Sequence, residues 1–249
     1  MSLEFLAPDR AEPFEGGRPL QRSPIEWVHR DAGARFEQAA GWNVVAGYGA
    51  SSRERAACRE TVGIADASQV GKIELQGERA AVDSIVAGLA GGTRLEPGSA
   101  ALRDGVWWCP VTADRVLALS EPEATADLRG RLESASASAA TFVSVTELTA
   151  ALGSNAVVGP LAREAFARTT ALDMRPDRFE ESAFAPVSVA RTPAMVLRQG
   201  RERYLHLFGA GYASYVWTVF IDAVESLGGA AVGAEGLRAA GGGEVGTGA

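Results

Sequence analysis

The chain has few of the residues that metal sites and charge-relay hydrolases need. Its 249 residues include two cysteines, Cys58 and Cys109, and two histidines, His29 and His206. Neither histidine has a second ligand at a spacing typical of zinc sites, so we expect no bound metal and two small buried cysteines. Two histidines also leave little room for a Ser-His-Asp triad. The G-x-S-x-G, Walker A and strand-linked G-x-G-x-x-G motifs are all absent from the sequence.

Long apolar runs and basic clusters are absent as well. No segment approaches the roughly 20 apolar residues of a membrane-spanning helix, so we expect no membrane association. The first residues are acidic and contain proline, without a basic region before an apolar core, which predicts a cytoplasmic protein without a secretory signal. Lys+Arg is 24, with a single lysine, against 31 Asp+Glu, and the net charge is -7. A nucleic acid is therefore not an expected partner.

What is present is typical of a soluble globular protein, with 47% hydrophobic and 22% charged residues. Residues 1–23 have little pattern and are interpreted as an N-terminal arm. Residues 24–240 carry regular patterns, and the glycine-rich residues 241–249 are interpreted as a disordered tail. We expect one helix to begin at Ser23 with Pro24 in its first turn. A second helix is expected to take Ser51 or Ser52 as its N-cap and to stop at Gly63.

The order of the patterns predicts an α+β fold. A strand-like alternation, an amphipathic helical stripe, a hairpin, a second helix and a last strand follow one another over residues 72–147. The same β-α-β-β-α-β order recurs over residues 155–240. We therefore predict two tandem split-βαβ (βαββαβ) units whose helices cover one face of each sheet. The cleft where the two sheets meet is a natural site for a small molecule.

The segment that ends in Gly-Ile-Ala-Asp-Ala-Ser (63–68) stands out between the second helix and the first unit. Asp66 and Ser68 are residue types that bond nearby backbone N–H groups and fix a turn. We interpret this segment as a structural corner first, with a direct chemical role as the alternative.

Several stretches in the same order resemble the glycine-cleavage T-proteins (aminomethyltransferases). The first is "GARFEQAAGWNVVAGYGA…RERAACRETVGIADAS". It contains the family's Gly-Trp pair, Tyr, helical Glu and Arg, and Gly-x-x-Asp-x-Ser corner, here Gly41, Trp42, Tyr48, Glu54, Arg59, Gly63, Asp66 and Ser68. "VGPLARE" (158–164) resembles a Gly-Pro-x-Ala-Arg helix start. A Gly-Ala-x-x-x-Leu-Arg corner ends at Leu237 and Arg238. Together these stretches span residues 24–240.

The resemblance implies a folate-binding fold that holds tetrahydrofolate in a central cavity. It also implies transfer of an aminomethyl group from a carrier or a small amine donor, with release of ammonia. The family's C-terminal β-barrel domain has no counterpart in this sequence. Its acidic pair is also missing, since only Asp104 precedes "GVWWCP"; Asp104 is either the remnant of a general base or part of an Asp-Gly turn. Gln69 stands where the family has His, and the resemblance implies that it faces the folate cavity.

The candidate folate-binding residues come from these matching stretches and from their departures. In "RQGRERYLHLF", Arg198 and Gly200 match the family's Arg-x-Gly, and Glu202 and Tyr204 follow in place of Tyr-Thr-Gly-Glu. Arg198 and Arg238 suit the carboxylates of a glutamate tail, although a solvated or ion-paired arginine is the alternative. Trp108 would stack on a pterin unless it packs in the core. His206 is interpreted as a satisfied, half-buried histidine.

Three functions are compatible with these features. The first is a folate-dependent, aminomethyltransferase-type protein of one-carbon metabolism with a degraded catalytic site. The second is a non-catalytic subunit similar to the γ subunit of heterotetrameric sarcosine oxidase, which packs against a larger flavoprotein; a glycine-cleavage protein is the corresponding partner for the first function. A regulatory folate-binding protein of the iron-sulfur-assembly branch is the third, but its Lys-Gly-Cys-Tyr-Thr-Gly-Gln-Glu motif is absent.

Overall fold

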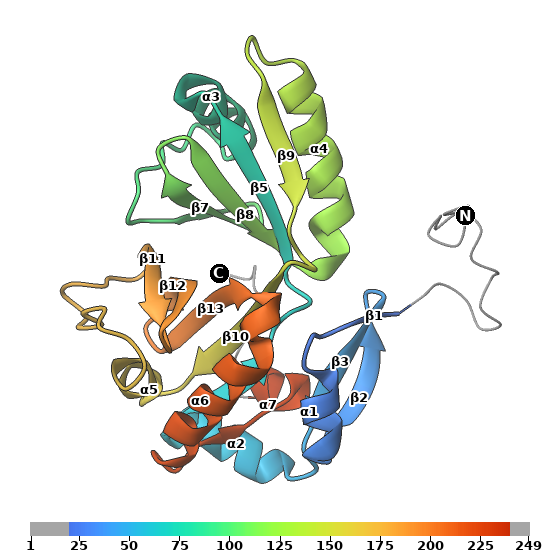
Figure 1. Cartoon of the computed structure of the whole chain (residues 1–249), viewed down its shortest axis with the longest axis vertical. Coiled ribbons are helices and arrows are strands. Elements are labelled where there is room, and N and C mark those ends of the chain that lie inside the picture. The colour runs from blue at the N-terminus through green and yellow to red at the C-terminus, as the bar shows by residue number, and fades with distance from the viewer. Residues whose placement is uncertain (1–19, 240–249) are drawn as a thin grey trace, which may run out of the picture.

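The fold was analysed in a computed structural model that describes residues 20–239. Most of the expected N-terminal arm and the expected glycine-rich tail lie outside the described residues. The described chain forms three β-sheets of three, six and five strands. Figure 1 shows the five-stranded sheet in the upper half of the molecule and the other two sheets in the lower half.

The first unit is the predicted β-α-β-β-α-β arrangement with one added strand. Its sheet has the antiparallel order β6-β7-β8-β5-β9. Helices α3 and α4 both pack on one face of this sheet, because Val82, Ile85, Leu128 and Leu132 are their buried apolar positions and join the same cluster as Ile73. The elements are β5 (Gly71–Gly77), α3 (Arg79–Leu89), β6 (Ala101–Arg103), β7 (Val106–Thr112), β8 (Arg115–Ser120), the short helix η3 (Pro122–Ala124), α4 (Thr125–Ala137) and β9 (Val143–Glu147).

The second unit also has the predicted helices and strands, but its sheet takes a strand from outside it. The order is β11-β12-β13-β10-β4-β14, so β4 lies between the first and last strands of the unit. Helices α5 and α6 cover one face through Phe166, Val216 and Phe220. The elements are β4 (Gly63–Asp66), β10 (Leu152–Val158), α5 (Ala162–Ala167), β11 (Phe184–Val189), β12 (Thr192–Gly200), β13 (Arg203–Gly209), η4 (Ala210–Tyr212), α6 (Ala213–Glu225) and β14 (Ala230–Ala231).

The position of β4 corrects the expectation for residues 63–66. Residues 63–66 were expected to belong to a corner after a helix, yet they form a buried central strand, paired antiparallel to β10 and parallel to β14. A strand buried on both faces does not alternate between apolar and polar residues, so no period-2 pattern marks it. Gly63 is required here, since a Cβ at this position would lie 2.7 Å from the Cys58 sulfur. The corner proper is therefore residues 66–70.

The remaining elements pack beside the second unit. They are β1 (Gln21–Arg22), α1 (Glu26–Asp31), β2 (Arg35–Ala39), β3 (Trp42–Gly47), α2 (Ser51–Glu60) and α7 (Ala234–Ala239). Helix α1 begins at Glu26, three residues later than expected. The N-cap of α2 is Ala50, with no side-chain cap, instead of Ser51 or Ser52. The buried Glu54 carboxylate instead accepts the backbone N–H groups of Tyr48 and Gly233, at 2.7 and 2.8 Å.

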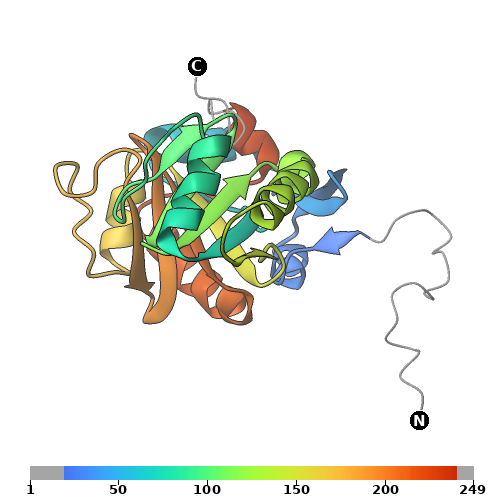
Figure 2. The same ribbon diagram turned by 90° about the horizontal axis from the view of Figure 1, so that it is seen from above.

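The two large sheets pack face to face. Trp107, Cys109, Leu117 and Leu119 of the first unit share one cluster with Ala156 and Leu205 of the second, among other residues. Figure 2 looks along the long axis and shows the first unit stacked over the second. The core therefore has three layers of apolar contact, with the sheet-to-sheet layer in the middle.

Among the helices of residues 20–239, none is both long enough and apolar enough to cross a membrane.

Candidate functional site

A cavity of about 590 Å³ lies where the two units meet the N-terminal strands. We call it the junction cavity. Its apolar surface comes from β3, the corner 66–70, β10, β13 and α7, through the side chains of Val44, Val70, Ala156, Leu205 and Leu237. A cavity of this size and apolar content suits a small-molecule ligand.

Charged side chains surround this apolar surface. Four carboxylates line the cavity, from Glu37, Asp66, Glu121 and Glu123, together with two guanidinium groups, from Arg203 and Arg238. Arg238 Nη2 donates to Glu37 Oε1 at 3.2 Å. Burial lowers the pKa of Arg203, and the charge of Glu121 opposes this shift. The cavity thus offers groups of both signs to a ligand.

The corner 66–70 is held by hydrogen bonds on several sides. Asp66 Oδ1 accepts the Ser68 N–H at 2.9 Å, which confirms that Asp66 fixes the turn. The Ser154 hydroxyl donates to Ala67 O at 2.7 Å. Lys72 is fully buried, and its Nζ donates to Ser68 O and Val70 O at 3.0 and 2.8 Å. These hydrogen bonds therefore hold the backbone of the corner in place beside the cavity.

Asp66 also begins a buried polar chain. Its Oδ2 lies 3.1 Å from His29 Nε2, and His29 Nδ1 lies 2.8 Å from the Tyr48 hydroxyl. Burial raises the pKa of Asp66, but hydrogen bonds and the charge of His29, with hydrogen bonds from Ser23 and Ser68, outweigh it and leave this pKa below its usual value. Asp66 is thus an ionised acceptor.

The structure brings two of the predicted binding residues to the junction cavity, Gln69 and Arg238. The Gln69 amide has no hydrogen-bond partner within residues 20–239, so its donors and acceptor are available to a ligand. Both residues belong to stretches whose sequence marks a turn or a helix end.

The other predicted site residues lie elsewhere. Asp104 is exposed at the tip of the β6–β7 hairpin, where its positive φ of 50° fits the Asp-Gly turn. Trp108 is buried beneath α3 and α4, so it packs in the core on the far face of the first sheet. Tyr204 is buried among the residues under α6. Glu202 is exposed in the β12–β13 turn.

Arg198 and His206 differ from the alternatives considered for them. The Arg198 guanidinium is buried and makes no ion pair within residues 20–239: it donates to the carbonyls of Phe179, Gly200 and Arg201 at 2.6 to 3.2 Å. His206 is fully buried against aromatic rings, and neither ring nitrogen has a partner within the described chain. Burial lowers the pKa of His206 to about 3, so it is neutral and unsatisfied.

Sequence reasoning missed Glu121, Glu123 and Arg203 as cavity residues. Glu121 and Glu123 flank Pro122, which precedes α4, and Arg203 is the first residue of β13. No local pattern marks these residues, because the cavity forms only when β8 of one unit faces β13 of the other.

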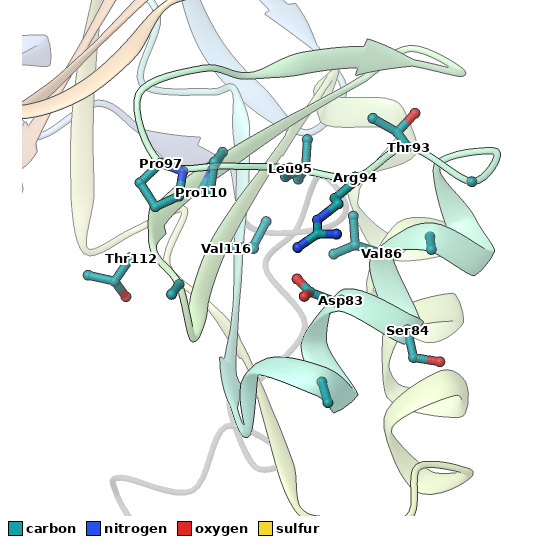
Figure 3. A pocket seen from close by; sticks show the side chains of 14 residues that line it. Asp83, Ser84, Val86, Thr93, Arg94, Leu95, Pro97, Pro110, Thr112 and Val116 are labelled. Atoms are coloured by element: carbon teal, nitrogen blue, oxygen red, sulfur yellow. The ribbon is translucent and has the colours of Figure 1, made fainter.

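A second cavity, of about 400 Å³, lies wholly within the first unit (Figure 3). It is formed by α3, residues 92–97 and the β7–β8 hairpin, and Figure 3 shows Asp83 on the helix and Arg94 on the following segment. Both side chains are more than a third exposed. None of the residues proposed above lines this cavity, so the junction cavity is the stronger candidate.

Three comparisons relate the chain to known proteins. The family model described as "GCVT N-terminal domain" matches residues 25–239. An aminomethyltransferase of Mycobacterium tuberculosis is 28% identical over 193 residues, which are 73% of this chain and 50% of that protein. A probable aminomethyltransferase of Halobacterium salinarum is 37% identical over 83 residues, 32% of this chain and 22% of the relative. The chain thus spans half the length or less of these curated relatives.

Two solved structures share the fold. The glycine cleavage system aminomethyltransferase T from Bartonella henselae aligns with a TM-score of 0.69 and 16% identity, over 89% of this chain and 60% of that one. A chain of the heterotetrameric sarcosine oxidase from Corynebacterium sp. U-96 aligns with a TM-score of 0.65 and 20% identity, over 84% of this chain and 97% of that one. These likenesses agree with the predicted T-protein-like folate-binding fold.

Proposed function

The chain belongs to the GCVT N-terminal domain family, and on that premise we propose that it binds tetrahydrofolate in the junction cavity as an aminomethyltransferase-type protein of one-carbon metabolism. The ligand and the reaction in this proposal rest on the family and on the cavity together. We also propose a cytoplasmic location and domain limits at residues 24 and 240.

The observation that carries the proposal is where two distant stretches meet. The corner 66–70 and helix α7 are separated by more than 160 residues, yet Gln69 and Arg238 line one cavity. Both stretches were singled out from the sequence by their resemblance to the T-proteins. If both stretches bind one folate, they must line one cavity, and this is the arrangement found.

The residues of the cavity fit the chemistry of a folate. Apolar side chains suit the faces of a pterin ring, and the free amide of Gln69 suits the alternating donors and acceptors of its edge. Arg203 and Arg238 suit the carboxylates of a glutamate tail. When bound, tetrahydrofolate would accept the methylene group of an aminomethyl thioether while ammonia and a free thiol leave.

A transfer of this kind needs a carboxylate near the folate nitrogens, which general acid–base catalysis would use. We assign this role to Glu121, at the end of β8, because it lines the junction cavity while Asp104 does not. Arg203, which lines the same cavity, interacts with the charge of Glu121 and has the opposite sign. Release of ammonia would show that the site catalyses the transfer, and folate binding without ammonia release would show that it only binds.

Calorimetric titration with 5-formyltetrahydrofolate, a reduced folate that resists oxidation, tests the proposal. We expect micromolar binding by the wild-type chain. Gln69→Ala should bind about tenfold more weakly, since a lost hydrogen bond costs roughly 1 to 1.5 kcal/mol. Gln76→Ala is the matched control, because Gln76 is exposed on β5 and does not line the cavity. No binding by the wild type, or equal affinity of both variants, would refute the proposal.

Exposed aromatic residues favour a second candidate function, a subunit that works with a larger flavoprotein. Large side chains are unusually exposed at four positions: Trp27 (59%), Phe142 (85%), Tyr212 (47%) and Tyr215 (50%). Tyrosine and tryptophan are enriched at protein interfaces. Purification of the tagged chain from its native cells tests this function. A stoichiometric partner with bound flavin, together with no folate binding by the isolated chain, would favour the subunit over the transferase.

A further inference from the structure

A chain of hydrogen bonds joins the junction cavity to another cavity, which is lined mainly by α2, α6 and β14. Asp66 lines the junction cavity and Tyr48 lines the other, which has a volume of about 310 Å³. His29 connects them, with Asp66 Oδ2 3.1 Å from its Nε2 and the Tyr48 hydroxyl 2.8 Å from its Nδ1. The three residues come from β4, α1 and the end of β3.

The surroundings hold the imidazole in one orientation. His29 is fully buried, and the Trp217 ring meets it edge to face with centroids 4.6 Å apart. On its other side the Tyr48 ring lies edge to face at 6.2 Å. Tyr48 is itself fixed, since its backbone N–H donates to the buried Glu54 carboxylate. The imidazole therefore has little freedom to rotate away from Asp66.

The protons along this chain can be assigned from chemistry. An ionised carboxylate only accepts hydrogen bonds, so His29 Nε2 carries a hydrogen atom and donates a hydrogen bond to Asp66. His29 Nδ1 shares its hydrogen bond, 2.8 Å long, with the Tyr48 hydroxyl. Burial, followed by the charges of Asp66 and Glu54, raises the pKa of Tyr48, so its hydroxyl keeps its proton.

We propose that His29 and Tyr48 are positioning residues that hold the Asp66 carboxylate against the Ser68 N–H and so present Gln69 to the ligand of the junction cavity. This inference rests on the proposed function for the identity of that ligand. The link is direct, since Asp66 Oδ1 accepts the Ser68 N–H at 2.9 Å while its other oxygen is held by His29. Gln69 follows at the next position of the same turn.

A purely structural role for His29 is the competing explanation, and His206 provides the control for it. His206 is the second histidine, is equally buried, and packs on the same face of the six-stranded sheet under α6. Its imidazole makes no hydrogen bond within the described residues. His206→Leu therefore changes core packing without touching the corner. A positioning role predicts different results for the two histidines.

The first experiment needs no ligand and measures hydrogen exchange of the Ser68 backbone amide by NMR. His29→Leu should speed exchange of this amide about tenfold or more, and Tyr48→Phe should speed it less. His29→Gln restores a side-chain N–H for Asp66 and should recover most of the protection. His206→Leu should leave it unchanged. Equal exchange in wild type and His29→Leu, or an equal effect of His206→Leu, would overturn the inference.

The second experiment measures affinity for 5-formyltetrahydrofolate in the same variants. We expect about tenfold weaker binding for His29→Leu, partial recovery for His29→Gln, and wild-type affinity for His206→Leu. Wild-type affinity in His29→Leu would overturn the inference while leaving the proposed function standing. If the wild type does not bind, the proposed function fails, and the Ser68 exchange rates still decide whether the chain of hydrogen bonds holds the corner.

Discussion

Lys72 allows a quantitative prediction because it is the single lysine of the chain and is fully buried. Burial lowers its pKa from 10.5 to about 7, and the charge of Asp66 opposes this shift only in part. The carbonyls of Ser68 and Val70, which accept from Nζ, also favour the ammonium form. Desolvation is the largest of these effects, so we expect the depressed pKa to dominate.

The sign of the pH dependence follows from proton binding. Between pH 7 and 10.5 the unfolded chain binds a proton at Lys72 that the folded chain has released. The free energy of unfolding therefore rises with pH in this window, by up to about 1.4 kcal/mol per pH unit. The cost of burial is fully present below the folded pKa and is lost as pH rises towards the unfolded one. From pH 7 to pH 9 the gain in stability is about 2 kcal/mol.

Urea unfolding of wild type and Lys72→Met, followed by tryptophan fluorescence at pH 7, 8 and 9 under reducing conditions, measures this effect. Methionine has a similar shape and does not titrate. Its missing donors shift the unfolding free energy by an amount that does not depend on pH. Every other group titrates equally in both proteins, so the difference between them should change by about 2 kcal/mol from pH 7 to 9. Two parallel curves would show that Lys72 keeps its proton in the fold.

Two further predictions concern other buried groups. Arg198→Met should lower the free energy of unfolding by about 3 kcal/mol, because three buried carbonyls lose a charged donor, while folate affinity stays within twofold; urea unfolding and calorimetry measure both. A loss of affinity without a loss of stability would instead support the ligand role first considered for Arg198. Burial raises the pKa of Cys58 to about 11 and also raises that of Cys109, so both thiols should react with a disulfide reagent at pH 8 only after denaturation. Rapid reaction of the native protein would contradict this.

Elements defined by local patterns could be predicted well. Helix α6 (Ala213–Glu225) follows from a regular apolar stripe, and the turns at Asp104-Gly105 and Ala113-Asp114 follow from residues that favour tight hairpins. The burial of one tryptophan of the pair Trp107-Trp108 could be predicted, because alternation along a strand places the two side chains on opposite faces of β7. That both faces are covered depends on the second unit, which packs over Trp107.

The candidate site was predictable only in part. Gln69 was found because the corner before it resembles the family's Gly-x-x-Asp-x-Ser, and Arg238 because it ends a stretch that resembles a family motif. Glu121 and Arg203 were not found, because each looks ordinary in its own segment and gains its meaning from the element opposite. Arg198 was misjudged because the carbonyls that surround its guanidinium come from a hairpin and a loop that no pattern describes.

The sequence by itself determined the type and order of most helices and strands, the family resemblance and the rigidity of the turn after Asp66, since these depend on side chains within a few residues of one another. Only the tertiary structure decided that β4 enters the second sheet, that Asp66 reaches Tyr48 through His29, and that four carboxylates and two arginines share a cavity. These contacts join residues far apart in the chain, and no local periodicity records which distant surface each will meet.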